Sequence, residues 1–479
     1  MTNNQPLKLN YKRTFIIGFA FFGILLLWQV YDSWCPTFLS ELFKSAIPNS
    51  TTEQVQYLVG IMMAIDNLAA LILLPIFGKL SDKTHTKIGK RMPYILVGTL
   101  VSAVIFPLIP LFFHLNSLVG TIIVMAITVC TMMMYRNPAV SLMPDMTPKP
   151  LRSKANGIIN IMGYIGGLFA TVVGIVFVLS EYINGKVIEG TDPVQYEATW
   201  QTGNLWAIEI PFLVASVLMV FSAIFLFIKI KENDIALQMK EEMKQGEEEA
   251  EVVDKVEEEG PMTKSNKIML LLILGAEFFW FMADNGIGTF MGNYTIYYLG
   301  ASTSSNMINT IVGGVGSVIG FAIGGIIASK IGRKWTVVTG LGTSLLSYLV
   351  WIVLTFTVLK GAAGSGQFPV AIWIIWFFKG FGMSLVHVNS FPMVVELCPS
   401  SKIGQFTGYY YAASMAAQTI TPIALGSLML IDGINFAFLP IYASICLVIS
   451  FSIFLVMKNV KLNKTKITKG LEAFDNDND

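Results

Sequence analysis

The sequence predicts an all-α polytopic membrane protein with twelve transmembrane helices in two pseudo-symmetric six-helix bundles. Three observations lead to this prediction. The chain of 479 residues is 54% hydrophobic and only 13% charged, it contains many long apolar stretches, and its two halves repeat each other. Soluble domains carry about twice that share of charged residues, so lipid is expected to be the main solvent of this chain.

Twelve stretches are long and apolar enough to cross a bilayer as a helix, which takes about 20 residues. Helices are expected rather than barrel strands, because lipid offers the backbone no hydrogen-bond partner and the stretches are too long for strands. The predicted spans are 14–40, 53–80, 92–114, 117–145, 152–180, 207–229, 267–299, 304–329, 335–359, 369–396, 403–430 and 434–458.

The distribution of charge predicts the orientation in the membrane. With twelve spans both termini lie on one side, and that side carries most of the 32 Lys and Arg residues. Positive residues mark the cytoplasmic side, so both termini are expected in the cytoplasm, with the protein in the plasma membrane. No cleavable signal peptide is expected, because residues 1–13 are polar and the first apolar run is too long.

A charged segment separates six spans from the other six. The predicted organisation is an N-terminal bundle (1–228), a charged cytoplasmic linker (229–266), a C-terminal bundle (267–458) and a cytoplasmic tail (459–479). The composition of the linker is typical of a solvated connection lying along the membrane surface. A regulatory or docking role for the linker stays open.

The two halves match at a series of positions in the same order. The matched pairs are Trp28 and Trp280, Asp32 and Asp284, Thr37 and Thr289, Phe38 and Phe290, Asp145 and Glu396, Pro148 and Pro399, and Gly157 and Gly408. Internal repeats of this kind are typical of secondary transporters, whose substrate sites lie between the repeats near the membrane midplane.

Two loops and two longer segments carry a resemblance to a known family. Residues 78–91 (GKLSDKTHTKIGKR) resemble the signature loop of the major facilitator superfamily, and residues 325–334 are its second copy, with Ser329 in place of the aspartate. Within that superfamily, residues 89–98 (GKRMPYILVG) and 135–163 (YRNPAVSLMPDMTPKPLRSKANGIINIMG) resemble the glycoside–pentoside–hexuronide:cation symporters and their sucrose-transporter relatives.

The resemblance implies the major facilitator fold, acting as a monomer. Helices 1, 4, 7 and 10 would line a central cavity that opens alternately to each side of the membrane. It also implies a glycoside or short oligosaccharide as the substrate, carried together with H⁺ or Na⁺.

The second span departs from the family pattern. Melibiose-type members carry two carboxylates there, just before a proline, as part of a Na⁺ site. Relative to Pro75 those positions are Ala70 and Leu74, and the acid nearby is Asp66. A lone carboxylate suits a proton better than Na⁺, which needs several oxygen ligands. The sequence therefore favours H⁺ as the coupling ion, with Na⁺ still open, and predicts no resident cofactor or metal.

Charged residues inside the spans are candidates for proton coupling. A charge at the bilayer centre costs about 2.5–3.5 kcal/mol on insertion scales, so such residues tend to face the bundle interior and to be functional. The candidates are Asp32, Asp66, Asp284, Glu277 and Lys379. Glu277 and Lys379 are expected to form an ion pair, either one that opens during transport or a structural bridge.

Polar and aromatic residues expected around the cavity are candidates for substrate binding. An indole could stack on a sugar ring, and carboxylates, amides and a guanidinium could bond its hydroxyls. Alternatively, the aspartates bond nearby backbone, the tryptophans pack against lipid, and the histidine is a satisfied core residue. The candidates are Trp28, Gln29, Asp32, Arg136, Asn160, Tyr164, Trp280, Asp284, Asn285, His387 and Asn389.

Charged residues at the cytoplasmic helix ends are candidates for gating. Asp82 is expected to pair with an Arg or Lys across a helix junction and hold one state closed, and Asp145 is expected beside Arg152. The full set is Asp82, Arg91, Asp145, Arg152, Arg333 and Glu396.

The expected function is proton-coupled symport of a glycoside by rocker-switch alternating access. The alternatives are a proton-coupled exporter of drugs or metabolites and a Na⁺-coupled glycoside symporter. The predicted fifth span lacks the proline of the usual antiporter motif, which disfavours export. A non-transporting sensor on the same fold is a further alternative. An enzyme and a nucleic-acid-binding protein are not expected, because no catalytic constellation, nucleotide-binding loop or basic–aromatic patch occurs in the sequence.

Overall fold

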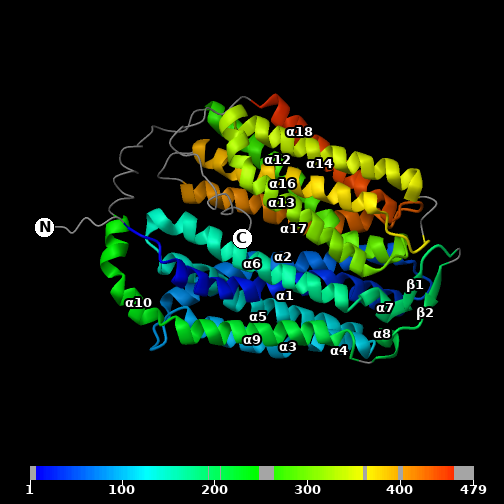
Figure 1. The fold of residues 1–479 in the computed structure, drawn as a ribbon, viewed down its shortest axis with the longest axis horizontal. Helices are drawn as coiled ribbons and strands as arrows, with labels where there is room; N and C mark the ends of the chain where they lie inside the picture. The colour runs from blue at the N-terminus through cyan, green and yellow to red at the C-terminus, as the bar shows by residue number, and fades with distance from the viewer. Residues whose placement is uncertain are drawn as a thin grey trace.

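The computed structural model describes residues 7–191, 194–204, 206–247, 264–359, 364–397 and 403–457. The described chain is almost entirely helical and forms two bundles that lie side by side (Figure 1). Helices α1–α9 form the lower bundle in that view and helices α12–α18 the upper one. The predicted fold class is confirmed.

Six long helical segments build each half. The N-terminal bundle consists of α1 (Tyr11–Ala46), α2 (Thr52–Lys83), α3 (Met92–Ile105) continued by α4 (Leu108–His114), α5 (Leu118–Asp145), α6 (Arg152–Val176) and α9 (Glu209–Lys229). The C-terminal bundle consists of α12 (Lys264–Asn293) continued by the π-helical turn η2 (Tyr294–Tyr298), α13 (Thr303–Ile331), α14 (Arg333–Phe356), α16 (Val370–Leu397), α17 (Ile403–Leu428) and α18 (Leu439–Val456).

Short elements join these helices. They are the 3₁₀ turns Lys149–Leu151 and Phe436–Phe438, the helices α7 (Leu179–Asn184), α8 (Trp200–Gly203) and α10 (Glu232–Gln238), and the strands β1 (Lys186–Ile188) and β2 (Gln195–Glu197). The two strands form an antiparallel hairpin in which Val187 faces Tyr196.

Eleven of the described helical segments are long and apolar enough to cross a membrane. The predicted span 403–430 corresponds to α17, which is not among these eleven, and polar residues such as Gln418, Thr419 and Thr421 lie in its second half. That part of α17 packs against α2 of the other bundle, so it does not need a fully apolar surface.

The sequence repeat appears as repeated packing. In the N-terminal bundle, α1 packs against α6 and α9, α5 against α2 and α3, and α3 against α9. The C-terminal bundle has the corresponding contacts: α12 packs against α17 and α18, α16 against α13 and α14, and α14 against α18. Each bundle also has its own buried core, with Phe38 and Phe212 in the first and Trp351 and Leu447 in the second.

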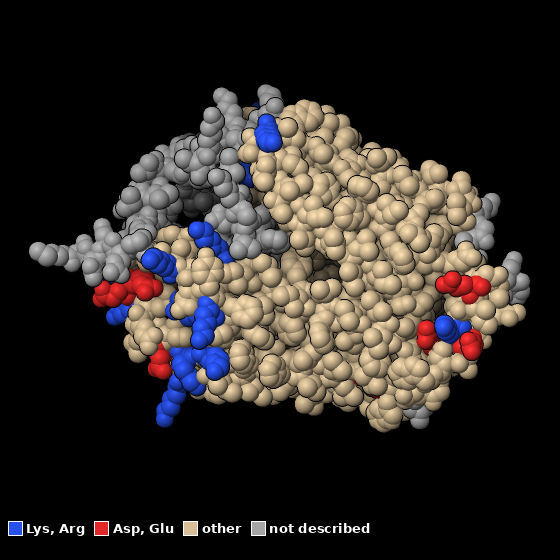
Figure 2. Space-filling model, in the orientation of Figure 1, with Lys and Arg blue, Asp and Glu red and all other residues tan. Residues whose placement is uncertain are grey.

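The two ends of the molecule differ. One end carries the β1–β2 hairpin and is called the hairpin end here. The opposite end carries the loop 84–91 and α10 and is called the linker end (Figure 1). In Figure 2, Lys and Arg side chains gather at the linker end, whereas the middle of that face carries no charge. Exposed basic residues there include Lys83, Lys87 and Lys231. A broad uncharged belt is what lipid contact requires.

The bundles touch each other through α2 with α17 and through α6 with α13. Glycine permits the closest approach. A Cβ atom on Gly60 would collide with the backbone carbonyl of Pro422, and one on Gly426 would collide with the backbone of Gln56 and Tyr57. These contacts lie between the cavity described below and the hairpin end.

Candidate functional site

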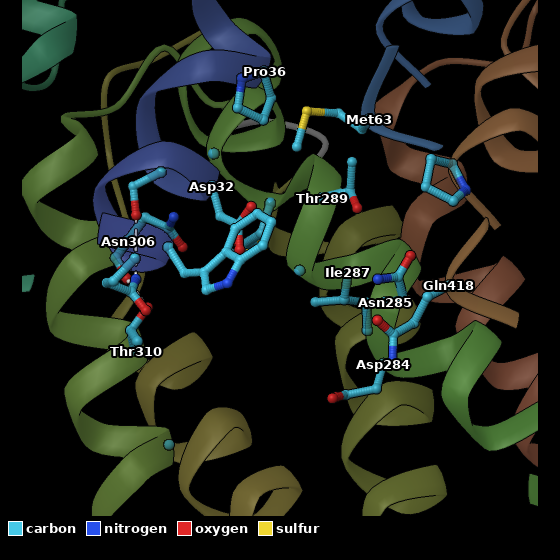
Figure 3. A pocket seen from close by; sticks show the side chains of 18 of the residues that line it. Asp32, Pro36, Met63, Asp284, Asn285, Ile287, Thr289, Asn306, Thr310 and Gln418 are labelled. Atoms are coloured by element: carbon cyan, nitrogen blue, oxygen red, sulfur yellow. Dashed lines mark hydrogen bonds between the residues drawn. The ribbon is translucent and has the colours of Figure 1, made fainter. Parts of the chain in front are cut away.

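A cavity of about 500 Å³ lies between the two bundles (Figure 3). Its lining residues come from α1, α2 and α5 of the first bundle and from α12, α13, α16 and α17 of the second. Helices 1, 4, 7 and 10 of the expected order, which are α1, α5, α12 and α16, all contribute. The volume falls within the range of small-molecule sites, about 300–1,000 Å³.

The lining is unusually polar for the interior of a membrane protein. It contains three carboxylates, two cations, many amides and hydroxyls, and two indoles. These residues are Asp32, Asp66, Asp284, Arg136, Lys379, Gln29, Asn67, Asn285, Asn293, Asn306, Gln418, Ser33, Thr37, Thr289, Thr310, Ser317, Trp28 and Trp376. Such a set can accept and donate many hydrogen bonds while presenting flat apolar surfaces.

Two carboxylates come from neighbouring helices of the N-terminal bundle. Asp66 on α2 is only 7% exposed and accepts a 2.6 Å hydrogen bond from the hydroxyl of Tyr31. The next residue on α1, Asp32, is exposed to the same cavity. Asp66 is the acid that the second span contributes to the cavity, and Asp32 of α1 is a second carboxylate there.

The third carboxylate belongs to an ion pair within the C-terminal bundle. Lys379 on α16 pairs with Asp284 on α12, and both side chains are partly exposed to the cavity. The sequence led us to expect Glu277 as the partner of Lys379, and this pairing is wrong. The two helices run antiparallel, and Lys379 lies at the level of Asp284, two helical turns nearer the hairpin end than Glu277.

Glu277 lies inside the C-terminal bundle rather than on the cavity. It is fully buried, and within the described part of the chain neither carboxylate oxygen has a hydrogen-bond partner. One turn further along α12, the ring of Trp280 packs edge-on against His387 with 4.5 Å between centroids. Trp280 and His387 therefore also belong to the bundle interior.

The other candidates for substrate binding divide into two groups. Trp28, Gln29, Arg136 and Asn285 line the cavity together with the aspartates. The remaining ones lie elsewhere: Asn160 is buried, Tyr164 is 43% exposed, and the buried amide of Asn389 bonds the carbonyl of Leu385 in its own helix. In Figure 3 the carboxylates of Asp32 and Asp284 extend toward the space between the helices.

Several cavity residues were missed by the sequence analysis. They include Trp376 on α16, Asn67 on α2 and Gln418 on α17. The amide of Asn67 donates to the backbone carbonyl of Gln418 at 3.2 Å, which links the two bundles beside the cavity. The signal that could have found Asn67 and Gln418 is a polar side chain inside an apolar span, as for the aspartates, and Trp376 gives no such signal.

Buried hydrogen bonds join the halves at the hairpin end. The amide of Asn293 on α12 accepts from Thr37 (2.9 Å) and donates to Ser40 (3.0 Å) and Gln56 (2.9 Å). These four side chains are at most 2% exposed. Together they close the hairpin side of the cavity. We call this group the Asn293 cluster.

Two further contacts between the halves accompany the Asn293 cluster. Tyr297 donates to Glu41 at 2.7 Å, and the backbone N–H of Thr303 donates to the hydroxyl of Ser180 at 3.0 Å. The hairpin end is therefore held by neutral donors and one carboxylate.

The gating candidates at the linker end form a charged network within the N-terminal half. Arg91 pairs with Asp82, and its Nε lies 2.8 Å from Asp145. Lys90 pairs with the same Asp145 at 3.0 Å. The predicted pairing of Asp82 with a basic residue across a helix junction is thus present, and its gating role stays a prediction.

Among the other gating candidates, Arg152 differs from expectation. Arg152 donates from Nε to the backbone carbonyl of Thr147 at 3.1 Å, so Lys90 and Arg91 are the partners of Asp145 in its place. Arg333 is buried, with 4% exposure, at the start of α14. The side chain of Glu396 lies outside the described residues.

Comparisons with known proteins agree with this architecture. Residues 18–396 match the profile of the family described as MFS/sugar transport protein. A search among curated proteins finds no match. The profile covers most of the chain.

Solved structures share the fold along the whole chain. The structure is similar to a D-xylose-proton symporter (TM-score 0.63, 15% identity, 96% of this chain and 100% of that one). It is also similar to an inward open conformation of the xylose transporter XylE from E. coli (0.63, 15%, 96% and 98%). A third is an auto inhibited POT family peptide transporter (0.61, 9%, 96% and 99%). The chain therefore belongs to the MFS/sugar transport protein family, and is an integral membrane transporter rather than an enzyme.

Proposed function

We propose that the protein is a proton-coupled symporter that imports a glycoside or short oligosaccharide across the plasma membrane by rocker-switch alternating access. The observation that carries the proposal is the polar cavity between the bundles, which is lined by carboxylates from both halves and closed at the hairpin end. One chain forms the whole cavity, so a monomer is the proposed transport unit.

The chemistry of the lining supports a sugar. A sugar ring offers hydroxyls around its edge and C–H groups on its faces. Amides such as Asn67, Asn285 and Gln418 can bond the hydroxyls, and the indoles of Trp28 and Trp376 offer flat apolar faces from opposite halves. A purely apolar drug would leave these polar groups without partners, which is costly in a dry site.

The carboxylates supply the coupling in this proposal. Within the described part of the chain, Asp32 lies in the cavity without an ion pair, whereas Asp284 is paired with Lys379. Asp32 would take up a proton while the cavity is open at the hairpin end, the sugar would bind, and the bundles would rock. Opening at the linker end would release both. The basic residues at the linker end support that end as the cytoplasmic side. The bonds of the Asn293 cluster would then close the cavity toward the outside.

The test is transport by the purified protein in liposomes loaded with a pH-sensitive dye. Sucrose, maltose and methyl glucosides are added outside, with and without Na⁺, and Asp32→Asn is run beside the natural protein. We expect acidification of the lumen that depends on one of the sugars, needs no Na⁺ and is lost in Asp32→Asn. Sugar uptake without proton movement in either direction would contradict proton coupling.

A specific observation favours Na⁺ as the second candidate for the coupling ion. Asp32 and Asp66 line the same cavity, and Asp66 also accepts from the Tyr31 hydroxyl. Carboxylate oxygens that share a cavity suit a hard cation. In the same liposomes, sugar uptake that requires a Na⁺ gradient would select this candidate. Uptake of drug-like cations against a proton gradient, with no response to sugars, would select export.

A further inference from the structure

The segment that follows the first bundle is docked onto the loop between α2 and α3. Glu232, the first residue of α10, is only 4% exposed, although glutamate is seldom buried without partners. Its carboxylate accepts from the backbone N–H groups of Lys90 (2.9 Å), Arg91 (3.1 Å to each oxygen) and Met92 (3.0 Å). The linker is therefore not a purely solvated connection at this point.

The carboxylate of Glu232 replaces a missing helix cap. Helix α3 begins at Met92, and its N-cap residue, Arg91, makes no capping hydrogen bond with its side chain. The first N–H groups of a helix have no partner within the helix, and the helix dipole favours a negative charge at this end. Glu232 satisfies both requirements from a segment that lies 140 positions further along the chain.

The loop is shaped to receive this carboxylate. Gly89 has a φ of +120°, and a Cβ atom there would overlap the carboxylate of Glu232. The next residue of α10, Asn233, donates to the backbone carbonyls of Thr86 (2.9 Å) and Lys87 (3.0 Å). Two consecutive residues thus bind the loop at both of its ends.

The loop that binds Glu232 also carries Arg91, the central residue of the charged network. Arg91 is 5% exposed, and its guanidinium reaches Asp82 on one side and Asp145 on the other. A buried guanidinium needs fixed geometry to satisfy its donors. Glu232 holds the peptide groups on both sides of Arg91, so it sets the direction in which that side chain leaves the backbone.

We propose that Glu232 is a positioning residue for Arg91, so that the first turn of the linker is part of the charged network at the linker end. The inference rests on the proposed function only in assuming that this network takes part in alternating access. The inference is testable because Glu232 acts through Arg91. Removing Glu232 should change the conformational equilibrium when Arg91 is present and leave it unchanged when Arg91 is absent.

The test is a double-mutant cycle with a readout that needs no sugar. The four cysteines are replaced, Thr310→Cys is introduced on the cavity wall, and the rate of its labelling by a soluble thiol reagent is measured in detergent. The variants are Glu232→Ala, Arg91→Ala and the double variant. Asp234→Asn is the matched control, because Asp234 is an exposed acid on the same short helix. Melting temperatures are recorded for each.

We expect Glu232→Ala to change the labelling rate about three-fold or more, and to change it by less than about two-fold in the Arg91→Ala background, because residues in one network are not additive. Asp234→Asn should match the natural protein. Equal changes in both backgrounds, or a lower melting temperature without any change in labelling, would show that Glu232 is only a helix cap and overturn the inference. If Glu232→Ala does not fold, Glu232→Gln, which keeps one acceptor oxygen, enters the same cycle. The labelling assay uses no sugar, so its result can be interpreted even if no sugar is transported in the liposome assay.

Discussion

The hairpin end and the linker end use different chemistry. At the hairpin end, the Asn293 cluster joins the two halves through neutral amides and hydroxyls that are almost completely buried. At the linker end, Arg91 joins Asp82 and Asp145 through charged contacts that stay within the N-terminal half. In the proposed rocker-switch cycle, the bonds of the Asn293 cluster must break, whereas the contacts of Arg91 need not.

This difference shows which contacts can set the balance between conformations. A bond shifts an equilibrium only if its strength differs between the two states. Neutral hydrogen bonds suit a surface that repeatedly opens, since water replaces them at a net cost of about 0.5–1.5 kcal/mol each. Charged pairs are better placed where they persist, because a buried charge that loses its partner is costly.

The largest expected effect is that of Asn293→Leu. The substitution removes three hydrogen bonds between the halves and leaves Ser40 and Gln56 without those partners, which should disfavour the hairpin-closed conformation by about 2–4 kcal/mol. Labelling of a cavity cysteine from the hairpin side of sealed liposomes should rise by more than ten-fold. Thr295→Val is the control, because Thr295 is equally buried but bonds the carbonyl of Met291 in its own helix. Equal labelling in the two variants would contradict a role for the Asn293 cluster in closure.

The next effect comes from shape rather than hydrogen bonding. Gly60→Ala places a methyl group against the backbone carbonyl of Pro422 in the other half, and a backbone atom cannot move aside as a side chain can. We expect the overpacking to disfavour the hairpin-closed conformation by about 1–3 kcal/mol. The rate of cavity labelling is measured as for Asn293→Leu. Gly275→Ala on α12 is the matched control, since nothing lies within 4 Å of its added Cβ. If both variants label alike, the α2–α17 contact does not decide the conformation.

A charged pair inside one half should affect folding more than conformation. Lys379→Ala leaves Asp284 without its partner, and both side chains are partly shielded, so we expect a loss of about 1–3 kcal/mol of stability. Thermal unfolding should show a lower melting temperature, and the double variant with Asp284→Ala should recover part of it. A shift in cavity labelling as large as that of Asn293→Leu would mean that this pair breaks during the cycle.

The sequence predicted the fold because the relevant signals are local or periodic: apolar runs of sufficient length and an internal repeat. It predicted the carboxylates of the cavity because a charge inside an apolar run stands out at once. It could not predict that Asn293 meets Thr37, since these residues lie 256 positions apart and neither is unusual in its own helix. Glu232 was overlooked for a related reason, because a single buried acid looks like its exposed neighbours in a charged segment.

The repeat also misled in one respect. Trp28 and Trp280 occupy matched positions, yet Trp28 lines the cavity while Trp280 is fully buried against Phe281 and His387. Matched positions in a repeat fix the helix and the depth of a residue. The neighbouring side chains, which differ between the halves, decide which way the residue turns.

The smallest expected effect is at the linker end. Asp82→Asn removes one of the two carboxylates that hold Arg91, and the Asp82 side chain is 59% exposed, so the free-energy change should stay below about 1 kcal/mol. Cavity labelling should change by less than about two-fold relative to Asp234→Asn, because Asp145 still holds the guanidinium of Arg91. A change as large as that of Asn293→Leu would show that the contact between Asp82 and Arg91 differs between the two conformations. Arg91 would then exchange partners when the linker end closes, and Asp82 would be a gate as the sequence led us to expect. Either outcome decides whether the contact between Asp82 and Arg91 is fixed or changes during the cycle, because only a contact that differs between the states can produce the larger shift.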